Sequence, residues 1–160
     1  MPAWMVVEDE PDIYDVLLAM FELWGVQGIA FVEGGDVMDW IADVDAGEYT
    51  GELPELAMLD IRLPEFSGPA IGERIRTSPK LKDIVVVLIT AYYLSPRDED
   101  AFKKQAQADA LMYKPLPNNS ELRARLSALI VERKARLAAP AIAATQGTKI
   151  PKVAPKNAKP

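Results

Sequence analysis

The feature that most constrains the fold is an alternation, repeated five times, between short apolar runs and stretches with helical periodicity. The apolar runs are Trp4–Val7, Val26–Val32, Leu56–Leu59, Ile84–Ile89 and Ala110–Tyr113. They lack the in-and-out alternation of a strand that has one face in water. Near-continuous apolar runs are typical of strands in a parallel sheet that is covered by helices on both faces.

The segments between the runs have apolar residues every three to four positions, which predicts helices. In the clearest segment, Pro11 lies near the start and Gly25 follows the end, as expected at helix termini. Its apolar residues share one helical face and are Ile13, Val16, Leu17, Met20, Phe21 and Trp24. Further helices are expected over about residues 37–44, 69–78, 95–107 and 118–137. Ser95 and Asn118 are predicted N-caps, because each is followed three residues later by an acid.

Strict alternation of five strands and five helices predicts right-handed crossovers and a parallel sheet. Roughly 135 residues are too few for an eight-stranded barrel. We therefore expect the α/β class, a doubly wound (βα)5 five-stranded parallel sheet with the flavodoxin-like strand order 2-1-3-4-5 and helices on both faces. This domain is assigned to residues 1–138.

The last part of the chain differs in composition. Residues 139–160 contain four lysines, four prolines and no aromatic residue, which predicts a disordered tail. Residues 117–160 hold nine Lys or Arg and two Glu, although the whole chain has a net charge of −6. Such a basic end could touch nucleic acid through charge alone, but its lysines are dispersed and no aromatic ring is available for stacking. A solvated helix face and tail is favoured, and nucleic acid is not an expected partner.

Histidine and cysteine are both absent from the chain. Their absence excludes disulfides, the usual zinc sites, catalysis by Ser-His-Asp or Cys-His groups and a phosphohistidine on this chain. The run Trp4–Val7 ends at Glu8 and has no positive segment before it, so we expect no signal peptide or membrane span there and a cytoplasmic protein.

Polar residues suited to phosphate chemistry follow four of the five runs. Glu8 and Asp9 follow the first run, Asp60 the third, Thr90 the fourth and Lys114 the fifth. Parallel strands all end at the same edge, where open α/β sheets bind their ligands. A single polar residue after a strand is what any solvated loop would show, but four strand ends of this kind together predict a site.

Asp9 and Asp60, at the ends of adjacent strands, would repel each other unless a cation lay between them. Carboxylates without imidazole or thiolate favour a hard ion, and Mg²⁺ is the best match. Such a metal and Lys114 would neutralise phosphate oxygens while Thr90 donates to another. Asp60 is then left as the nucleophile.

Four segments resemble the receiver domain of two-component response regulators, and the resemblance covers about residues 3–137. They are Met5–Asp12, Leu59–Gly68, Leu88–Ala91 and Lys114-Pro115. The resemblance implies a stand-alone receiver in which Asp60 accepts a phosphoryl group from a phosphohistidine. The donor would be a sensor histidine kinase or a histidine phosphotransfer protein, which agrees with the absence of histidine here. No other enzymatic activity is expected besides phosphorylation and hydrolysis at Asp60.

The resemblance also implies the roles of the residues around Asp60. Asp9 and Asp60 would bind Mg²⁺ directly, the backbone carbonyl of Arg62 would complete the protein ligands, and Glu8 would act largely through a water molecule. Thr90 and Lys114 would contact the phosphoryl group. Pro64 and Gly68 would shape the loop after Asp60, and the Lys114-Pro115 bond is commonly cis in such domains.

One position departs from the family pattern. The switch residue three positions before Lys114 is usually Tyr or Phe, and here it is Leu111. Nearby tyrosines are candidates for a substitute, although ordinary packing is the favoured interpretation of Tyr92, Tyr93 and Tyr113. We still expect movement of Thr90 and the following loop to couple to the face formed by residues 95–137. The same face is where a homodimer would form.

Several other functional classes lack their required residues in this chain. A haloacid-dehalogenase-type phosphatase needs a second Asp where this chain has Arg62, and a flavin binder needs a phosphate loop where it has Glu8 and Asp9. No nucleotide-binding P-loop motif is present. The remaining alternative is a phosphorelay shuttle or phosphate sink without a dedicated effector. Arg62 and Tyr92 flank the path of attacking water and are expected to set the lifetime of the acyl phosphate.

Overall fold

The computed structural model describes residues 1–139, and these contain the five strands and five helices expected from the sequence. The strands are β1 (Ala3–Val7), β2 (Gln27–Phe31), β3 (Leu56–Asp60), β4 (Val85–Thr90) and β5 (Ala110–Tyr113). The helices are α1 (Pro11–Leu23), α2 (Gly34–Asp45), α3 (Gly68–Thr77), α4 (Pro96–Ala106) and α5 (Asn119–Ala138). The alternating pattern of the sequence is thus confirmed, with boundaries shifted by a few residues.

Side chains cap the last two helices as predicted. The hydroxyl of Ser95 accepts a hydrogen bond from the N–H of Asp98 at 3.1 Å. The side-chain oxygen of Asn118 accepts from the N–H of Glu121 at 3.0 Å. Each cap satisfies one of the backbone donors that a helix leaves unpaired at its first turn.

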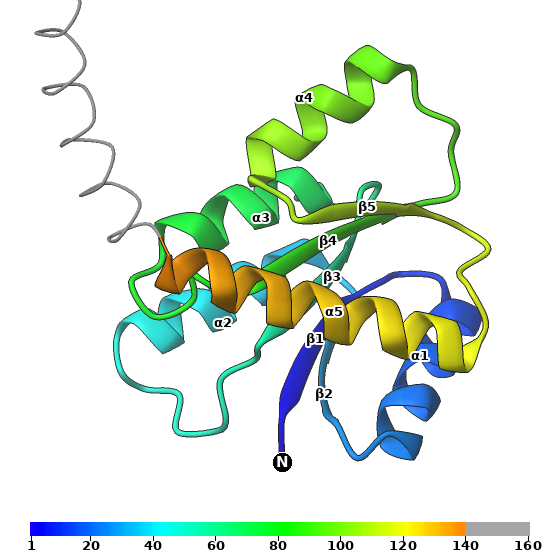
Figure 1. Cartoon of the computed structure of the whole chain (residues 1–160). Helices are drawn as coiled ribbons and strands as arrows, with labels where there is room; N and C mark the ends of the chain where they lie inside the picture. Colours follow the sequence, from blue (N-terminus) through cyan, green and yellow to red (C-terminus); the bar gives the residue numbers. More distant parts are fainter. Residues whose placement is uncertain (140–160) are drawn as a thin grey trace, which may run out of the picture.

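All strand pairs are parallel, and the strand order is β2-β1-β3-β4-β5, which confirms the predicted topology. Two helices cover one face of the sheet and three cover the other (Figure 1). On one side, Leu17 and Phe21 of α1 pack with α5, and on the other Ile41 of α2 and Ile71 of α3 pack against β1, β3 and β4. The central strands β1, β3 and β4 are buried throughout, which explains why their sequences are continuously apolar.

The apolar face of α1 is only partly covered. Leu17 and Phe21 are buried, but Val16 is 51% exposed although the helical pattern predicted that it would pack inward. The reason is that the segment after β5 stands off from α1 and leaves a groove of about 480 Å³ between them. Leu137, near the end of α5, is likewise 46% exposed.

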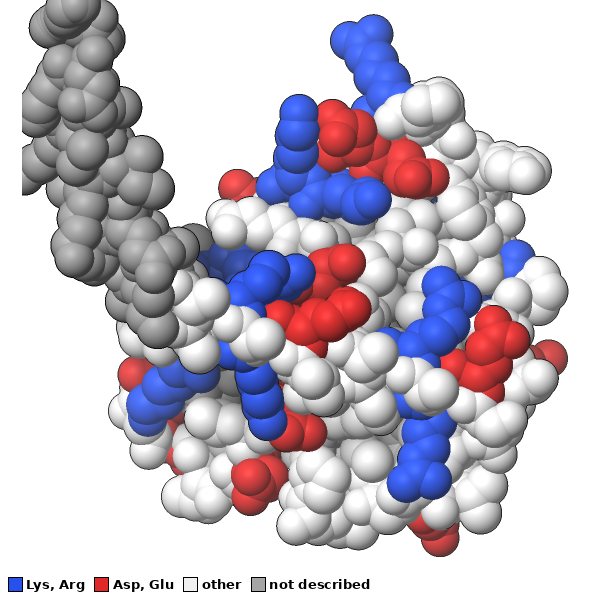
Figure 2. Space-filling view, in the orientation of Figure 1, with Lys and Arg blue, Asp and Glu red and all other residues white. Residues whose placement is uncertain are grey.

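Basic and acidic side chains are interspersed on the face that carries α5 (Figure 2). Arg125 lies near Glu121, and Lys134 lies 3.3 Å from Glu55. Both of these basic residues of α5 thus have an acidic neighbour. The predicted disordered tail, residues 139–160, lies outside the described residues apart from its first residue, so it stays a prediction. In the described part of the chain, no helix is both long enough and apolar enough to cross a membrane.

Candidate functional site

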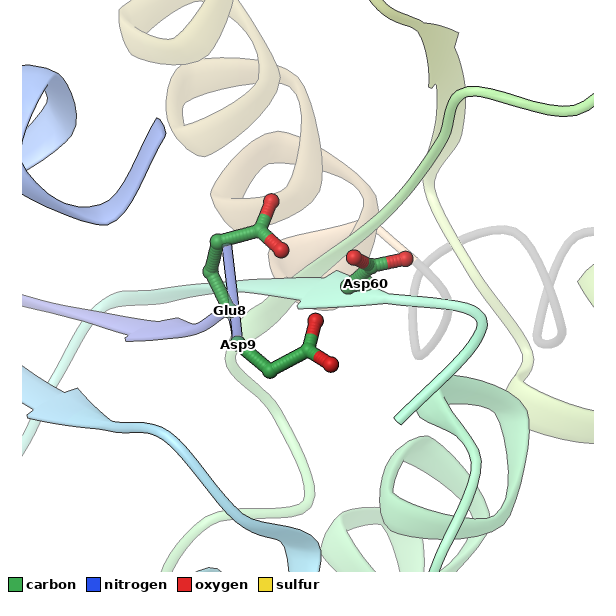
Figure 3. Close-up of side chains that lie close together, drawn as sticks. All are labelled: Glu8, Asp9 and Asp60. Atoms are coloured by element: carbon green, nitrogen blue, oxygen red, sulfur yellow. The ribbon is translucent and has the colours of Figure 1, made fainter. Parts of the chain in front are cut away.

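The carboxyl ends of β1 and β3 bring three acids together, as the sequence predicted. One carboxylate oxygen from each of Glu8, Asp9 and Asp60 lies within 4.8 Å of the others. The three side chains lie close together at the ends of two neighbouring strands (Figure 3). Glu8 and Asp60 are buried, whereas Asp9 is exposed at the mouth of the cluster. Such a set of oxygens without imidazole or thiolate suits a hard divalent cation.

Lys114 supplies the positive charge of the cluster. Its ammonium lies 2.7 Å from Oε1 of Glu8, 3.0 Å from Oδ2 of Asp60 and 3.3 Å from Oε1 of Glu10. Although burial alone would lower the pKa of Lys114, the neighbouring carboxylates of Glu8 and Asp60 raise it above its usual value. Lys114 is therefore a fixed cation at the edge of the sheet. The Lys114-Pro115 bond is cis, as expected.

One ammonium does not balance these carboxylates. Burial, together with hydrogen bonding to Asp60, raises the pKa of Glu8 from 4.5 to about 7 despite the opposing effect of Lys114. Within the described chain, Oε1 of Glu8 makes no hydrogen bond of good geometry and has only the short ion pair with Lys114. A buried acid that is so poorly compensated fits a site that takes up a further cation.

Asp60 is the last residue of β3, and the loop that follows contacts its carboxylate. The N–H of Arg62 donates to Oδ1 of Asp60 at 3.1 Å, and this fixes the orientation of the carboxylate. Gly68 donates its N–H to the carbonyl of Ile61 at 3.1 Å, and a Cβ at Gly68 would collide with the carbonyl of Asp60. The predicted need for a glycine here therefore has a steric cause. The structure gives no contact for the carbonyl of Arg62, so its role as a metal ligand stays a prediction.

Thr90 ends β4 and is fully buried. Its hydroxyl accepts a hydrogen bond from the N–H of Tyr92 at 3.1 Å, and its carbonyl accepts from the N–H of Lys114 at 2.8 Å. Thr90 thus connects the loop before α4 with the residue that follows β5.

The guanidinium of Arg62 lies over the ring of Tyr92, 4.2 Å from the ring centroid. This pair joins the loops after β3 and β4 at a cleft of about 220 Å³. The cleft is lined by Asp9, Glu10, Asp60, Arg62, Ala91, Tyr92 and Lys114. Sequence reasoning placed Arg62 and Tyr92 beside the cleft, but it did not predict that they stack on each other.

Leu111 lies in β5 opposite Leu88, partly buried against the core on the side of α2, α3 and α4. Tyr113 lies two residues further along and opposite Thr90. Because residues two apart in a strand share a face, Tyr113 points to the same side of β5 as Leu111. Its hydroxyl donates to a carboxylate oxygen of Glu99 in α4 at 2.7 Å.

Comparison with known families decides what kind of protein this is. Residues 4–127 match the model of the response regulator receiver domain, which spans the sheet, the acidic cluster and Lys114. The chain belongs to the receiver domain family. Phosphorylation-based signalling is general for this family, whose members take their phosphoryl group from histidine kinases or phosphotransfer proteins.

The receiver domain is similar to Protein Rrf1 of Nitratidesulfovibrio vulgaris, with 30% identity over 58% of this chain and 62% of that protein. It is 28% identical to the DNA-binding dual master transcriptional regulator RpaA of Synechocystis, over 81% of this chain and 49% of RpaA. The chain therefore spans about half to three fifths of the length of these two relatives.

A solved receiver domain with the same fold belongs to a sensor histidine kinase of Pseudomonas aeruginosa. It has a TM-score of 0.64 and 21% identity and covers 81% of this chain and 97% of that one. In that structure a magnesium ion is coordinated in the active site cleft.

Glu10 is the residue of the site that sequence reasoning missed. It stands next to the predicted pair Glu8 and Asp9 but in the sequence looks like an ordinary acid at the start of a helix. Its contact with Lys114 spans 104 residues, and no local pattern predicts such a contact.

Proposed function

We propose that Asp60 of this receiver domain accepts a phosphoryl group from a phosphohistidine on a histidine kinase or phosphotransfer protein, and that the phosphorylated state changes partner binding. One observation carries the proposal. The carboxylate of Asp60 lies 3.0 Å from the ammonium of Lys114 and in the same cluster as Glu8 and Asp9. Phosphoryl transfer to a carboxylate needs a nucleophilic carboxylate, a fixed cation and a set of oxygen ligands.

The acidic cluster fits Mg²⁺, and we propose Asp9, Asp60 and the carbonyl of Arg62 as direct ligands, with Glu8 acting through water. When bound, Mg²⁺ neutralises negative charge on the carboxylates and on the phosphoryl oxygens. In the transfer, an oxygen of Asp60 forms a bond to phosphorus while the bond from phosphorus to the donor imidazole nitrogen breaks. The electron pair of that bond stays on the imidazole. Lys114 and the hydroxyl of Thr90 then donate hydrogen bonds to the phosphoryl oxygens.

The groove beside α1 supports docking of a donor protein at this site. It is mainly apolar, with Ile13 and Met20 on one wall and Leu116 on the other, and it reaches Lys114. An apolar helix face of the donor that fills this groove would bring its phosphohistidine to the mouth of the cleft.

Intact-protein mass spectrometry tests the proposal. The full chain is incubated with acetyl phosphate and Mg²⁺, and we expect a mass increase of about 80 Da that corresponds to one phosphoryl group. Asp60→Asn should show no increase, and chelation of the metal should prevent it in the native chain. Asp15→Asn removes an exposed acid of α1 and serves as the control, which should be labelled like the native chain. Labelling of Asp60→Asn to the native extent would disprove the assignment.

A further inference from the structure

Glu10 occupies the N-cap position of α1 but does not cap the helix. Its side chain makes no hydrogen bond to the first turn of α1, whereas Ser, Thr, Asp or Asn at this position would normally do so. Its carboxylate instead turns toward Lys114, with Oε1 3.3 Å from the ammonium. The side chain of Glu10 is 56% exposed. The side chain of Glu10 thus contacts Lys114, which is distant in the sequence, and makes no hydrogen bond to the first turn of its own helix.

This contact completes a set of three carboxylates around the ammonium of Lys114. A lysine ammonium carries three N–H donors. In the structure, three carboxylates surround it, from Glu8, Asp60 and Glu10. A phosphoryl oxygen that approaches Lys114 therefore competes with these three carboxylates for the ammonium. Glu10 has the longest contact and is the only exposed member of the three, so its contact breaks at the lowest cost.

Glu10 also stands where a phosphoryl donor enters. Glu10 and Lys114 line both the cleft around Asp60 and the apolar groove beside α1. The carboxylate of Glu10 adds negative charge at the point through which an anionic phosphoryl group must pass, and like charges in a partly desolvated cleft repel.

We infer that Glu10 competes with the phosphoryl group for Lys114, so that it weakens binding of phosphoryl groups and slows labelling by small anionic donors. The inference rests on the proposed function and adds a residue that tunes the same site. Glu10 positions Lys114 in the unphosphorylated state and must release it when Asp60 is phosphorylated.

The test compares the full chain with Glu10→Gln and Glu10→Ser. Serine is a good N-cap, so the second variant removes the acid without weakening the start of α1. Binding of beryllofluoride, a phosphoryl analogue, is titrated in the presence of Mg²⁺ by NMR, and the rate of labelling by acetyl phosphate is followed by mass spectrometry. Both affinity and rate should rise about twofold to fivefold in each variant, the range expected for loss of one exposed ion pair.

Asp12→Asn is the matched control. It removes an acid two residues away that also lines the groove, and within the described chain it forms no ion pair with Lys114. Its affinity and rate should stay close to those of the native chain. Equal or weaker beryllofluoride binding in both Glu10 variants would overturn the inference, as would an equal gain in Asp12→Asn. A native chain that is neither labelled nor bound by beryllofluoride would overturn the proposed function instead.

Discussion

The hydroxyl of Tyr113 donates a hydrogen bond to the carboxylate of Glu99 at 2.7 Å, and this contact ties the end of β5 to the first turn of α4. The hydrogen bond raises the pKa of Tyr113, so its hydroxyl stays protonated near neutral pH and remains a donor. Tyr113 also lies opposite Thr90, and the ring of Tyr93 lies 5.7 Å from its ring. We therefore expect a displacement of Thr90 and the following loop to alter this contact.

Tyr113→Phe should reduce the response of α4 to phosphorylation, since it removes the hydroxyl and keeps the ring. Backbone NMR shifts of residues 96–106 should change less on addition of beryllofluoride and Mg²⁺ than they do in the native chain. Tyr49→Phe is the control, because within residues 1–139 its hydroxyl donates a hydrogen bond only to the carbonyl of Glu52, away from the site. Shift changes in α4 equal to those of the native chain would show that the hydroxyl transmits nothing.

Tyr92→Ala should shorten the lifetime of the phosphorylated state. The ring of Tyr92 and the guanidinium of Arg62 stack beside the cleft that holds Asp60. We expect this pair to restrict the access of water to Asp60. We expect hydrolysis to be about twofold to fivefold faster, in keeping with the modest energy of an exposed cation–π pair. Decay of the phosphorylated mass with time measures the rate. Tyr92→Phe keeps the stacking ring and should decay at the native rate, whereas an unchanged or longer lifetime in Tyr92→Ala would contradict the prediction.

Affinity for Mg²⁺ should increase as pH rises toward 7. The pKa of Glu8 is about 7 in the folded protein and 4.5 as a free group, so the folded state binds the extra proton between these values. The contribution of Glu8 to the free energy of unfolding of the metal-free protein is therefore fully present below about pH 4.5. It is lost as pH rises through 7. Mg²⁺ requires the ionised carboxylate, so its binding releases the proton.

Calorimetric titration with Mg²⁺ at several pH values measures this linkage. Below pH 7 the apparent affinity of the native chain should fall by up to about tenfold per pH unit, the limit for release of one proton. Glu8→Gln carries no ionisable group at this position and should lose this part of the pH dependence. A flat affinity for the native chain across the same range would argue against proton uptake by Glu8.

Asp109→Asn should destabilise the fold strongly. The carboxylate of Asp109 is 2% exposed and accepts hydrogen bonds from the backbone of Val86 and from Arg76 and Arg133. The side chain of Arg76 is 5% exposed and would lose its only charged partner among the described residues. Urea unfolding should show a loss of about 3 kcal/mol, as for other buried pairs that lose one member. Arg136→Gln removes an exposed partner of the same carboxylate and should cost less than about 1 kcal/mol. A similar small loss in Asp109→Asn would show that this cluster is not a major source of stability.

Much of the fold and the core of the site follow from local sequence. The apolar runs of β1, β3 and β4 indicate strands buried on both faces, and Ser95 and Asn118 mark helix starts because capping involves only neighbouring residues. Once the sheet is parallel, its topology carries the residues at the strand ends to one edge. Asp60 and Lys114 could therefore be placed together without knowledge of any side-chain contact.

Other features depend on the spacing between distant elements and on the direction of side chains, and only the tertiary structure decided them. The turn of Glu10 toward Lys114, the stacking of Arg62 on Tyr92 and the exposure of Val16 have no local signal. A periodic pattern shows which face of a helix is apolar, but not how closely the neighbouring segment approaches that face. A loop side chain follows no period at all, so its partner is set only when the sheet brings two loops within reach.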